Sequence, residues 1–170
     1  MKKSIFIIMA LVTCLLIATL AFANDDIKKH PSCKYCGMDR EKFAHSRMLI
    51  EYDNGSTVGT CSIHCTAVDL ALNIDLFPKF LGVGDFFGKN LIDAEKAFWV
   101  IGGNKPGVMT QKAKWAFATK EGADKFIKEN GGVPGDFDQA LKASYENINE
   151  DTRMIRERRK MRRQQMMEKK

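Results

Sequence analysis

Two short cysteine motifs hold the side chains of this chain that are best suited to chemistry. The first reads Cys33-Lys-Tyr-Cys36-Gly-Met38 and the second reads Cys61-Ser-Ile-His-Cys65, with 24 residues between Cys36 and Cys61. Thiolate and thioether sulfurs are soft donors that select Cu(I) or Zn(II) over Mg(II) or Ca(II). The glycine after Cys36 lets the backbone curl so that both thiols of the first motif can point inward. This pattern predicts a metal or thiol site.

Methionine and histidine add further candidate ligands to the cysteines. Met38 either ligates a metal or packs under the first motif, and Met109 lies in a turn from which it could close the site. His64 is expected near a helix start, where it either ligates or faces solvent. The candidate metal ligands are therefore Cys33, Cys36, Cys61, Cys65, Met38, His64 and Met109.

The four cysteines leave alternatives to a copper site open. The fifth cysteine, Cys14, would leave with a cleaved signal peptide, so the mature chain would have an even number and, in an oxidising compartment, two disulfides would account for all of them. A closed cage of four thiolates would suit structural Zn(II), whereas an open site with two or three sulfurs suits a metal that is passed on. We also expect the positive end of a helix to favour the thiolate of Cys65.

A unit of two strands and a helix is predicted to position the second motif. Residues 46–52 and 57–61 are strand-like, and the Asn-Gly pair between them is typical of a type I′ hairpin turn. Ser62 can cap a helix, because apolar residues follow it at helical spacing. Cys61 then ends a strand and Cys65 lies one turn into the helix.

The same order of elements is predicted a second time. Residues 97–101 and 114–118 are expected to form strands around a turn region rich in Gly and Pro, and Thr119 is expected to cap a helix. We therefore expect an α+β fold of two similar ββα halves with a long C-terminal helical tail. The expected parts are a signal peptide at 1–23, a leader at 24–32, a metal-binding domain at 33–135, and a C-terminal helix with a basic tail at 136–170.

The first residues read as an export signal. Lys2 and Lys3 precede an uncharged stretch at 5–20, and Ala21-Phe22-Ala23 is an A-x-A cleavage site. Cleavage would leave 147 residues (170 minus 23), enough for one compact domain. We expect a periplasmic protein with a cleaved signal, and the alternative is an uncleaved N-terminal membrane anchor.

The leader and the region after the first motif hold the remaining histidines. The leader is polar and without periodicity, so we expect it to be extended and loosely held. His30 in that leader is suited to transient capture of a metal. His45, beside a predicted strand, is expected at the surface.

The positive charge of the chain is concentrated at its C-terminus. Residues 151–170 hold nine Lys and Arg against three Asp and Glu, which equals the net charge of +6. Without this tail and the two signal lysines the net charge is −2, so no basic face for nucleic acid is expected in the core. Beyond Ile148 the predicted helix is charged all round and should leave the body. This tail is expected to be dispensable for folding and to suit an anionic membrane surface or an acidic client.

No catalytic constellation is found in the sequence. There is no Ser/His/Asp order and no phosphate-binding glycine loop, and three histidines are too few for a hydrolytic zinc site. We therefore do not expect an enzyme.

At several positions the chain resembles the NosL family. The resemblance runs from about Cys33 to Phe137 and includes the CxxCGM motif, the hairpin, Met109 and the tryptophan-containing segments around Trp99 and Trp115. The second cysteine motif also looks like half of a TRASH-type heavy-metal motif.

This resemblance implies a function and partners. NosL proteins are exported accessory proteins of nitrous oxide reductase, an enzyme of denitrification, and are regarded as Cu(I) chaperones with two similar ββα halves. It therefore implies an exported Cu(I) chaperone that serves an apo copper enzyme or exchanges copper with a membrane copper transporter. The alternative is a heavy-metal binding or sensing domain, stabilised by Zn(II) or disulfides, without a delivery role.

Overall fold

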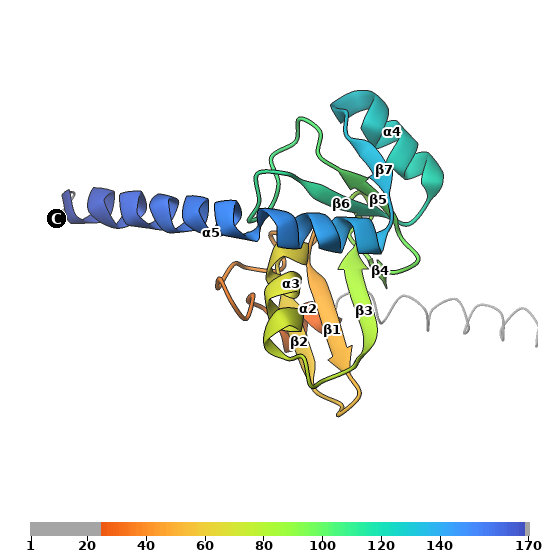
Figure 1. Cartoon of the computed structure of the whole chain (residues 1–170), viewed down its shortest axis with the longest axis horizontal. Helices are drawn as coiled ribbons and strands as arrows, with labels where there is room; N and C mark the ends of the chain where they lie inside the picture. The colour runs from red at the N-terminus through yellow and green to blue at the C-terminus, as the bar shows by residue number, and fades with distance from the viewer. Residues whose placement is uncertain (1–24, 169–170) are drawn as a thin grey trace, which may run out of the picture.

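Two antiparallel sheets and a long C-terminal helix build the protein. A computed structural model describes residues 25–168, and the predicted signal peptide lies outside them. Helix α5 (Phe137–Glu168) crosses the region between the two sheets, and its C-terminal half projects from the body (Figure 1). The predicted α+β class is confirmed. Within the described residues no helix is both long enough and apolar enough to cross a membrane.

The first half contains a four-stranded sheet in the order β2-β1-β3-β4. All neighbouring strands are antiparallel, and one helix follows the β1–β2 hairpin. The elements are β1 (Met48–Tyr52), β2 (Thr57–Thr60), α3 (Ile63–Leu72), β3 (Pro78–Gly84) and β4 (Leu91–Asp93).

The second half repeats this arrangement with a three-stranded sheet in the order β6-β5-β7. Its elements are β5 (Phe98–Ile101), β6 (Lys114–Phe117), α4 (Lys120–Asn130) and β7 (Val133–Gly135). Each half contains the predicted ββα unit, and the strand after the helix returns to pair with the first strand of the hairpin; β4 extends the first sheet further. These returning strands contain Pro and Gly, which are poor strand formers, and this explains why the sequence pattern does not indicate them.

Local chemistry explains where the elements begin and end. Thr119 caps α4 as predicted, since its hydroxyl accepts a hydrogen bond from the Gly122 amide at 3.1 Å. Ser62 stands at the N-cap of α3 in an extended conformation, but its side chain makes no capping bond. In the β1–β2 turn only Gly55 has a positive φ, of 80°, within the described hairpin. The predicted type I′ turn is therefore wrong, because that turn needs positive φ at both central residues.

Two apolar clusters form the interior. One joins the facing sides of the two sheets with the start of α5, and Trp99 at its centre donates its indole N–H to the Ala94 carbonyl at 2.8 Å. The other packs Cys33, Cys61 and Cys65 with the aromatic residues of the second half, including Trp115 and Phe117. The sulfur site is therefore built into the core.

The residues before the first cysteine motif form a short, firmly attached helix. Helix α2 spans Asp25–Lys29, and Asp26 within it is buried. Its carboxylate lies 2.7 Å from Arg40 Nη2 and 2.9 Å from Arg47 Nε, and both guanidiniums are also buried. The expected extended, loosely held leader is therefore wrong, because a buried ion network ties it to the residues that flank β1.

Helix α5 stays attached to the body beyond Ile148. Asp151 is 1% exposed, and its Oδ1 accepts a hydrogen bond from the Gln111 amide at 2.9 Å. A polar contact makes this attachment. The sequence therefore shows no apolar stripe here that would predict it. The expectation that the helix leaves the body beyond Ile148 is therefore wrong at Asp151, and the dispensability of residues 151–170 for folding stays a prediction.

We predict that Asp26→Ala lowers the free energy of unfolding by about 3–5 kcal/mol, because it leaves two buried guanidiniums without their carboxylate. Burial alone would raise the pKa of Asp26, but hydrogen bonds and charges from Arg47 and Arg40 hold it below its usual value. The contribution is therefore present above the unfolded pKa of about 4 and is lost as pH falls through the lower folded pKa. Denaturant unfolding at neutral and acid pH measures both effects. Asp25→Ala, at an exposed neighbouring carboxylate, serves as the control and should change little.

Candidate metal centre

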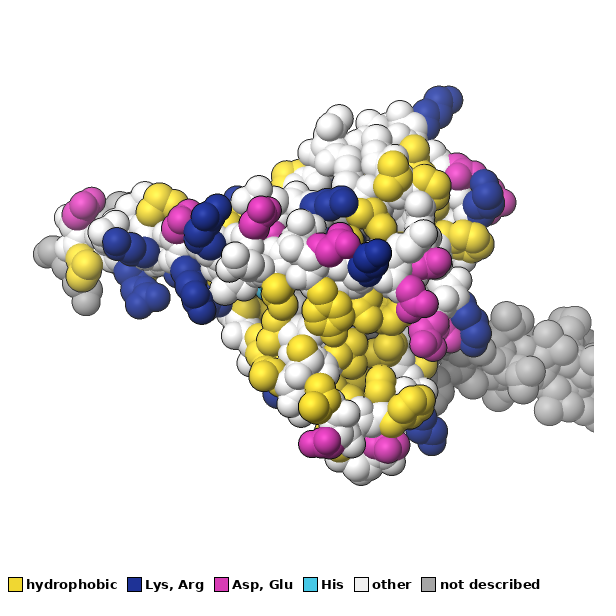
Figure 2. Space-filling model, viewed as in Figure 1, with side chains coloured by type: hydrophobic (Ala, Val, Ile, Leu, Met, Phe, Trp, Pro, Cys, Tyr) yellow, Lys and Arg dark blue, Asp and Glu magenta, His cyan; other side chains and the backbone are white. Residues whose placement is uncertain are grey.

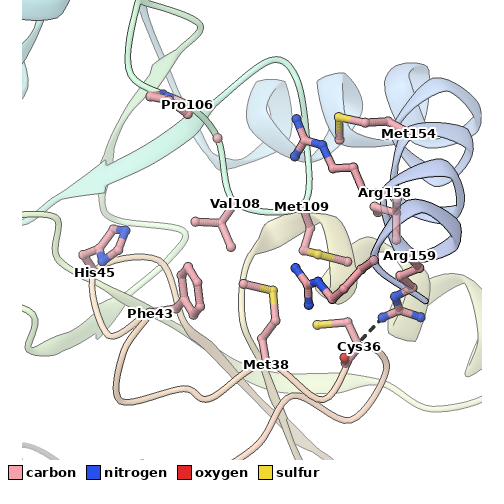
Figure 3. A pocket seen from close by; sticks show the side chains of 13 residues that line it. Cys36, Met38, Phe43, His45, Pro106, Val108, Met109, Met154, Arg158 and Arg159 are labelled. Atoms are coloured by element: carbon pink, nitrogen blue, oxygen red, sulfur yellow. Dashed lines mark hydrogen bonds between the residues drawn. The ribbon is translucent and has the colours of Figure 1, made fainter. Parts of the chain in front are cut away.

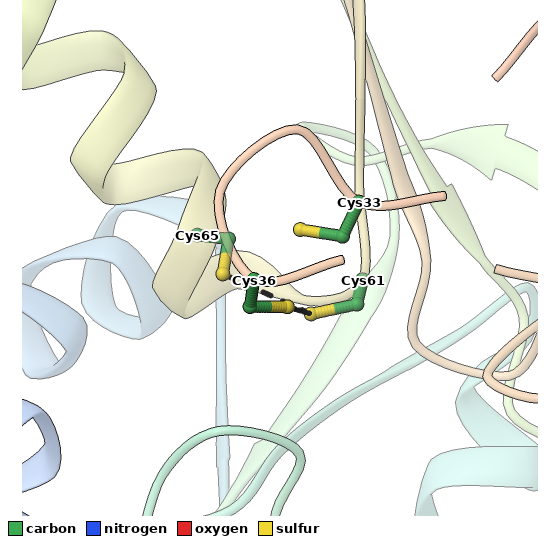
Figure 4. Close-up of side chains that lie close together, drawn as sticks. All are labelled: Cys33, Cys36, Cys61 and Cys65. Atoms are coloured by element: carbon green, nitrogen blue, oxygen red, sulfur yellow. Dashed lines mark hydrogen bonds between the residues drawn. The ribbon is translucent and has the colours of Figure 1, made fainter. Parts of the chain in front are cut away.

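The four cysteines of the two motifs converge on one point. Their sulfur atoms all lie within 4.8 Å of one another (Figure 4). Cys36 Sγ is 3.4 Å from Cys61 Sγ, and Cys61 Sγ is 3.8 Å from Cys65 Sγ. A metal–sulfur bond of about 2.3 Å in a tetrahedral site separates the sulfurs by about 3.8 Å. The cluster therefore has the dimensions of a four-thiolate metal site.

Residues Cys33–Met38 form a tight turn, here called the knuckle. The Cys33 amide donates to the Met38 carbonyl at 2.8 Å, and the Gly37 amide donates to the Cys33 carbonyl at 2.9 Å. Gly37 has a φ of 72°, a conformation that a residue with a Cβ rarely adopts. The predicted role of the glycine after Cys36 is thus confirmed.

A buried carboxylate on α3 holds the knuckle against the second motif. Asp69 lies one turn after Cys65 and has no exposed surface. It accepts hydrogen bonds from Tyr35 Oη at 2.5 Å and from Lys34 Nζ at 2.9 Å, the two residues between the knuckle cysteines. Tyr52 Oη, on β1, donates to the same carboxylate at 2.5 Å. The side chains inside CxxC therefore fix the position of its thiols.

Sequence analysis did not single out Asp69. An acidic residue four positions after Cys65, on a helix that is otherwise largely apolar, is the signal that could have found it. Burial, together with hydrogen bonding to the Asp69 carboxylate, raises the pKa of both Tyr35 and Tyr52, so both phenols stay protonated as donors.

The thiols of the cluster differ in acidity. Hydrogen bonds from the Cys36 and Cys61 thiols hold the pKa of Cys33 below its usual value. Hydrogen bonding with the Cys33, Cys36 and Cys61 sulfurs, together with burial, raises the pKa of Cys65. The four thiols share their protons in this cluster, so the prediction that Cys65 ionises readily stays a prediction.

One side of the cluster opens on a groove of about 560 Å³. The groove is lined by side chains between residues 36 and 45, between 106 and 109, and between 154 and 162 of α5 (Figure 3). Cys36 is half-buried and lines it, whereas Cys33, Cys61 and Cys65 are buried. The knuckle is therefore the accessible side of the cluster.

Methionine thioethers surround this opening. Met38, Met109 and Met154 line the groove, and the sulfurs of Met38 and Met109 lie on the same side of it as Cys36 (Figure 3). Met109 has a φ of 60°, which is unusual for a residue with a side chain. The neighbouring Gln111–Asp151 hydrogen bond helps to hold its loop. The structure thus places both predicted methionines beside the thiols, and their role as ligands stays a prediction.

His64 belongs to a buried polar cluster behind the thiols. The residue is 4% exposed, so the solvent-facing alternative is wrong, and its Nδ1 lies 3.5 Å from Asp151 Oδ2. Burial lowers the pKa of His64 in spite of that carboxylate. Burial also lowers the pKa of the nearby Lys114 to about 8. His64 is not among the ligand atoms that converge, and a role for it as a metal ligand stays a prediction.

The other two histidines also differ from expectation. The Nε2 of His30 is hydrogen-bonded to Thr57 Oγ1 on β2 at 2.9 Å. This contact attaches the residue to the sheet, whereas a mobile leader was expected. His45 is half-buried, with its ring centroid 5.5 Å from that of Trp115, and it lines the groove. Aromatic packing therefore holds His45 where a surface position was expected.

Comparisons with known proteins agree with this architecture. The family model described as NosL matches residues 80–144, which confirms the resemblance to that family. A crystal structure described as the copper chaperone NosL from Shewanella denitrificans matches with a TM-score of 0.51 and 22% identity, over 63% of this chain and 87% of that chain. That likeness shows the fold. No curated protein matches the sequence.

These matches bear on the cysteines and on catalysis. The four cysteines of the cluster lie before residue 80, outside the part of the chain that the family model covers. The solved neighbour is described as a copper chaperone, and at 22% identity it shows the fold alone, so the absence of enzyme activity stays a prediction.

We predict that Asp69→Asn loosens the knuckle while the fold persists. The neutral amide weakens three hydrogen bonds that now end on a charge, and we expect unfolding to become easier by about 3 kcal/mol. We also expect faster reaction of the half-buried Cys36 with a thiol reagent, followed by absorbance under reducing-agent-free, anaerobic conditions. Asp75→Asn, at an exposed carboxylate just after α3, is the matched control. Equal thiol reactivity in the two variants would contradict the role of Asp69.

Proposed function

We propose that this NosL-family protein is an exported Cu(I) chaperone that delivers copper to a periplasmic copper enzyme such as nitrous oxide reductase. The observation that carries the proposal is the asymmetry of the sulfur cluster. Three thiols are buried in the core, while Cys36 lines a groove open to solvent. A site of this kind holds a soft metal firmly and leaves one ligand within reach of an acceptor.

The donor set favours Cu(I) as cargo. Thiolates bind both Cu(I) and Zn(II), but thioether sulfur is a soft ligand suited to Cu(I). Met38 and Met109 lie beside Cys36 at the open side of the cluster, where they can receive copper as a thiolate lets go. Met38, Met109 and the four cysteines are therefore the proposed ligands, and His64 is proposed only as a support behind Cys65.

Copper is proposed to leave by ligand substitution at the knuckle. An incoming thiolate or thioether would reach Cu(I) through the groove and bind before the Cu–S bond to Cys36 breaks. The remaining thiols keep the metal enclosed during this step, since the aromatic residues of the second half pack against them. Transfer can then be fast although the equilibrium affinity is high.

The alternative is a structural zinc site or a pair of disulfides without a delivery role. The sulfur separations fit a tetrahedral four-thiolate cage, so of these two alternatives they favour structural zinc over disulfides. We predict that protein isolated from the exporting compartment carries copper, or reloads with it, in native mass spectrometry. Tightly held zinc would support the structural site, and a mass four protons light without metal would indicate two disulfides.

We predict that Cys33→Ser with Cys36→Ser lowers the affinity for Cu(I) by more than about 100-fold, because two thiolates are lost from the site. Anaerobic titration of the reduced protein against a Cu(I) chelator measures this. Met166→Leu with Met167→Leu removes two exposed thioethers far along α5 and is the matched control. Unchanged affinity in the cysteine variant would exclude the proposed site.

The same variants test delivery. Copper-loaded protein mixed with apo nitrous oxide reductase should give growth of the copper-centre absorbance, and the cysteine variant should give none beyond free copper. If a host strain lacking the gene still has fully metallated exported copper enzymes, storage or sensing would replace delivery.

A further inference from the structure

Three arginines of α5 gather over the open side of the sulfur cluster. Arg158, Arg159 and Arg162 line the groove together with Cys36, and no carboxylate among the described residues lines it. Within residues 25–168 none of the three lies in an ion pair. The groove therefore combines soft sulfur ligands with positive charge that the described part of the chain does not neutralise.

One of these arginines contacts the knuckle directly. Arg159 Nη2 donates a hydrogen bond to the Cys36 carbonyl at 3.2 Å (Figure 3). This exposed contact joins residues 123 positions apart and bridges the accessible cysteine to the tail. A carboxylate binds a guanidinium more strongly than a carbonyl does, since it carries the opposite charge and can accept two parallel N–H···O bonds. An acidic group entering the groove would therefore compete for Arg159 and release the knuckle.

The position of α5 makes this surface reachable. Figure 2 shows Lys and Arg side chains gathered along the part of α5 that projects from the body. The three groove arginines are exposed, so a partner can contact them without any unfolding of the domain. Opposite charge on a partner would also speed encounter and orient it over the cluster.

We propose that the groove is the docking site for an acidic protein segment of the partner that exchanges copper with this chain, an inference that rests on the proposed function. A protein partner fits better than a lipid surface, because the arginines surround the opening through which a metal ligand must pass. Carboxylates of the segment would pair with Arg158, Arg159 and Arg162, while a sulfur ligand beside them would reach Cys36.

Exchange of copper replaces one Cu–S bond with another. The partner's thiolate forms a new Cu–S bond, the bond between copper and Cys36 breaks, and Cys36 leaves as a thiolate. Copper remains Cu(I), so the step needs no oxidant or reductant. The arginines stay charged throughout and offset the negative charge of the two thiolates that face each other during exchange.

The test uses the reduced, metal-free mature chain and a fluorescein-labelled peptide of alternating Glu and Gly, with a Gln/Gly peptide for comparison. We expect R158Q/R159Q/R162Q to bind the Glu peptide about tenfold more weakly than the unmodified chain, measured by fluorescence anisotropy. The matched control R156Q/K160Q/R163Q removes the same charge from the same helix but at residues that do not line the groove. It should bind within about threefold of the unmodified chain. Circular dichroism checks that α5 persists in both variants.

The outcomes separate this inference from the proposed function. Equal weakening in both triple variants, or equal binding of the Glu and Gln peptides, would overturn a docking site at the groove. Binding to phosphatidylglycerol vesicles that the groove variant alone loses, without binding to the Glu peptide, would overturn it in favour of a lipid surface. Selective loss of peptide binding supports docking even if the Cu(I) titration fails, because the peptide assay contains no metal.

Discussion

The buried carboxylate of Asp69 is the interaction on which the sulfur cluster depends. A charge without exposed surface is tolerated only when several donors satisfy it, and here two donors come from the knuckle and one from β1. Because Asp69 and Cys65 lie on the same face of α3, one turn apart, the same bonds bring the knuckle thiols to Cys65. The two middle residues of the CxxC motif thus act as its anchors.

A second buried network approaches the knuckle from the other side. Asp26 on α2 binds Arg40 and Arg47, and Arg40 also donates to backbone carbonyls of His30, Thr60 and Met48. Arg40 therefore ties together the chain before the knuckle and the end of β2, which leads into Cys61. Because both the segment before the knuckle and the end of β2 are restrained, the thiols are already ordered before a metal binds. Metal binding therefore loses little further conformational entropy.

Helix α5 connects the two halves to the site. Its start packs in the core between the sheets, Asp151 holds the loop that carries Met109, and the next turns place methionine and arginine over Cys36. The second half contains no cysteine, yet its loop and its aromatic residues supply one wall of the groove and the packing behind the thiols. Each half therefore contributes to a site whose thiols come from only one of them.

The sequence by itself determined the soft-ligand chemistry, the α+β class, both hairpins and the main helices, because these follow from residue types and from periodicity along the chain. Only the tertiary structure decided what depends on residues distant in sequence. The returning strands β3 and β7, the burial of Asp69 and the attachment of Asp151 all depend on partners that no local pattern indicates. The burial of His64 has the same reason, because α5 packs against α3, the helix that carries this residue.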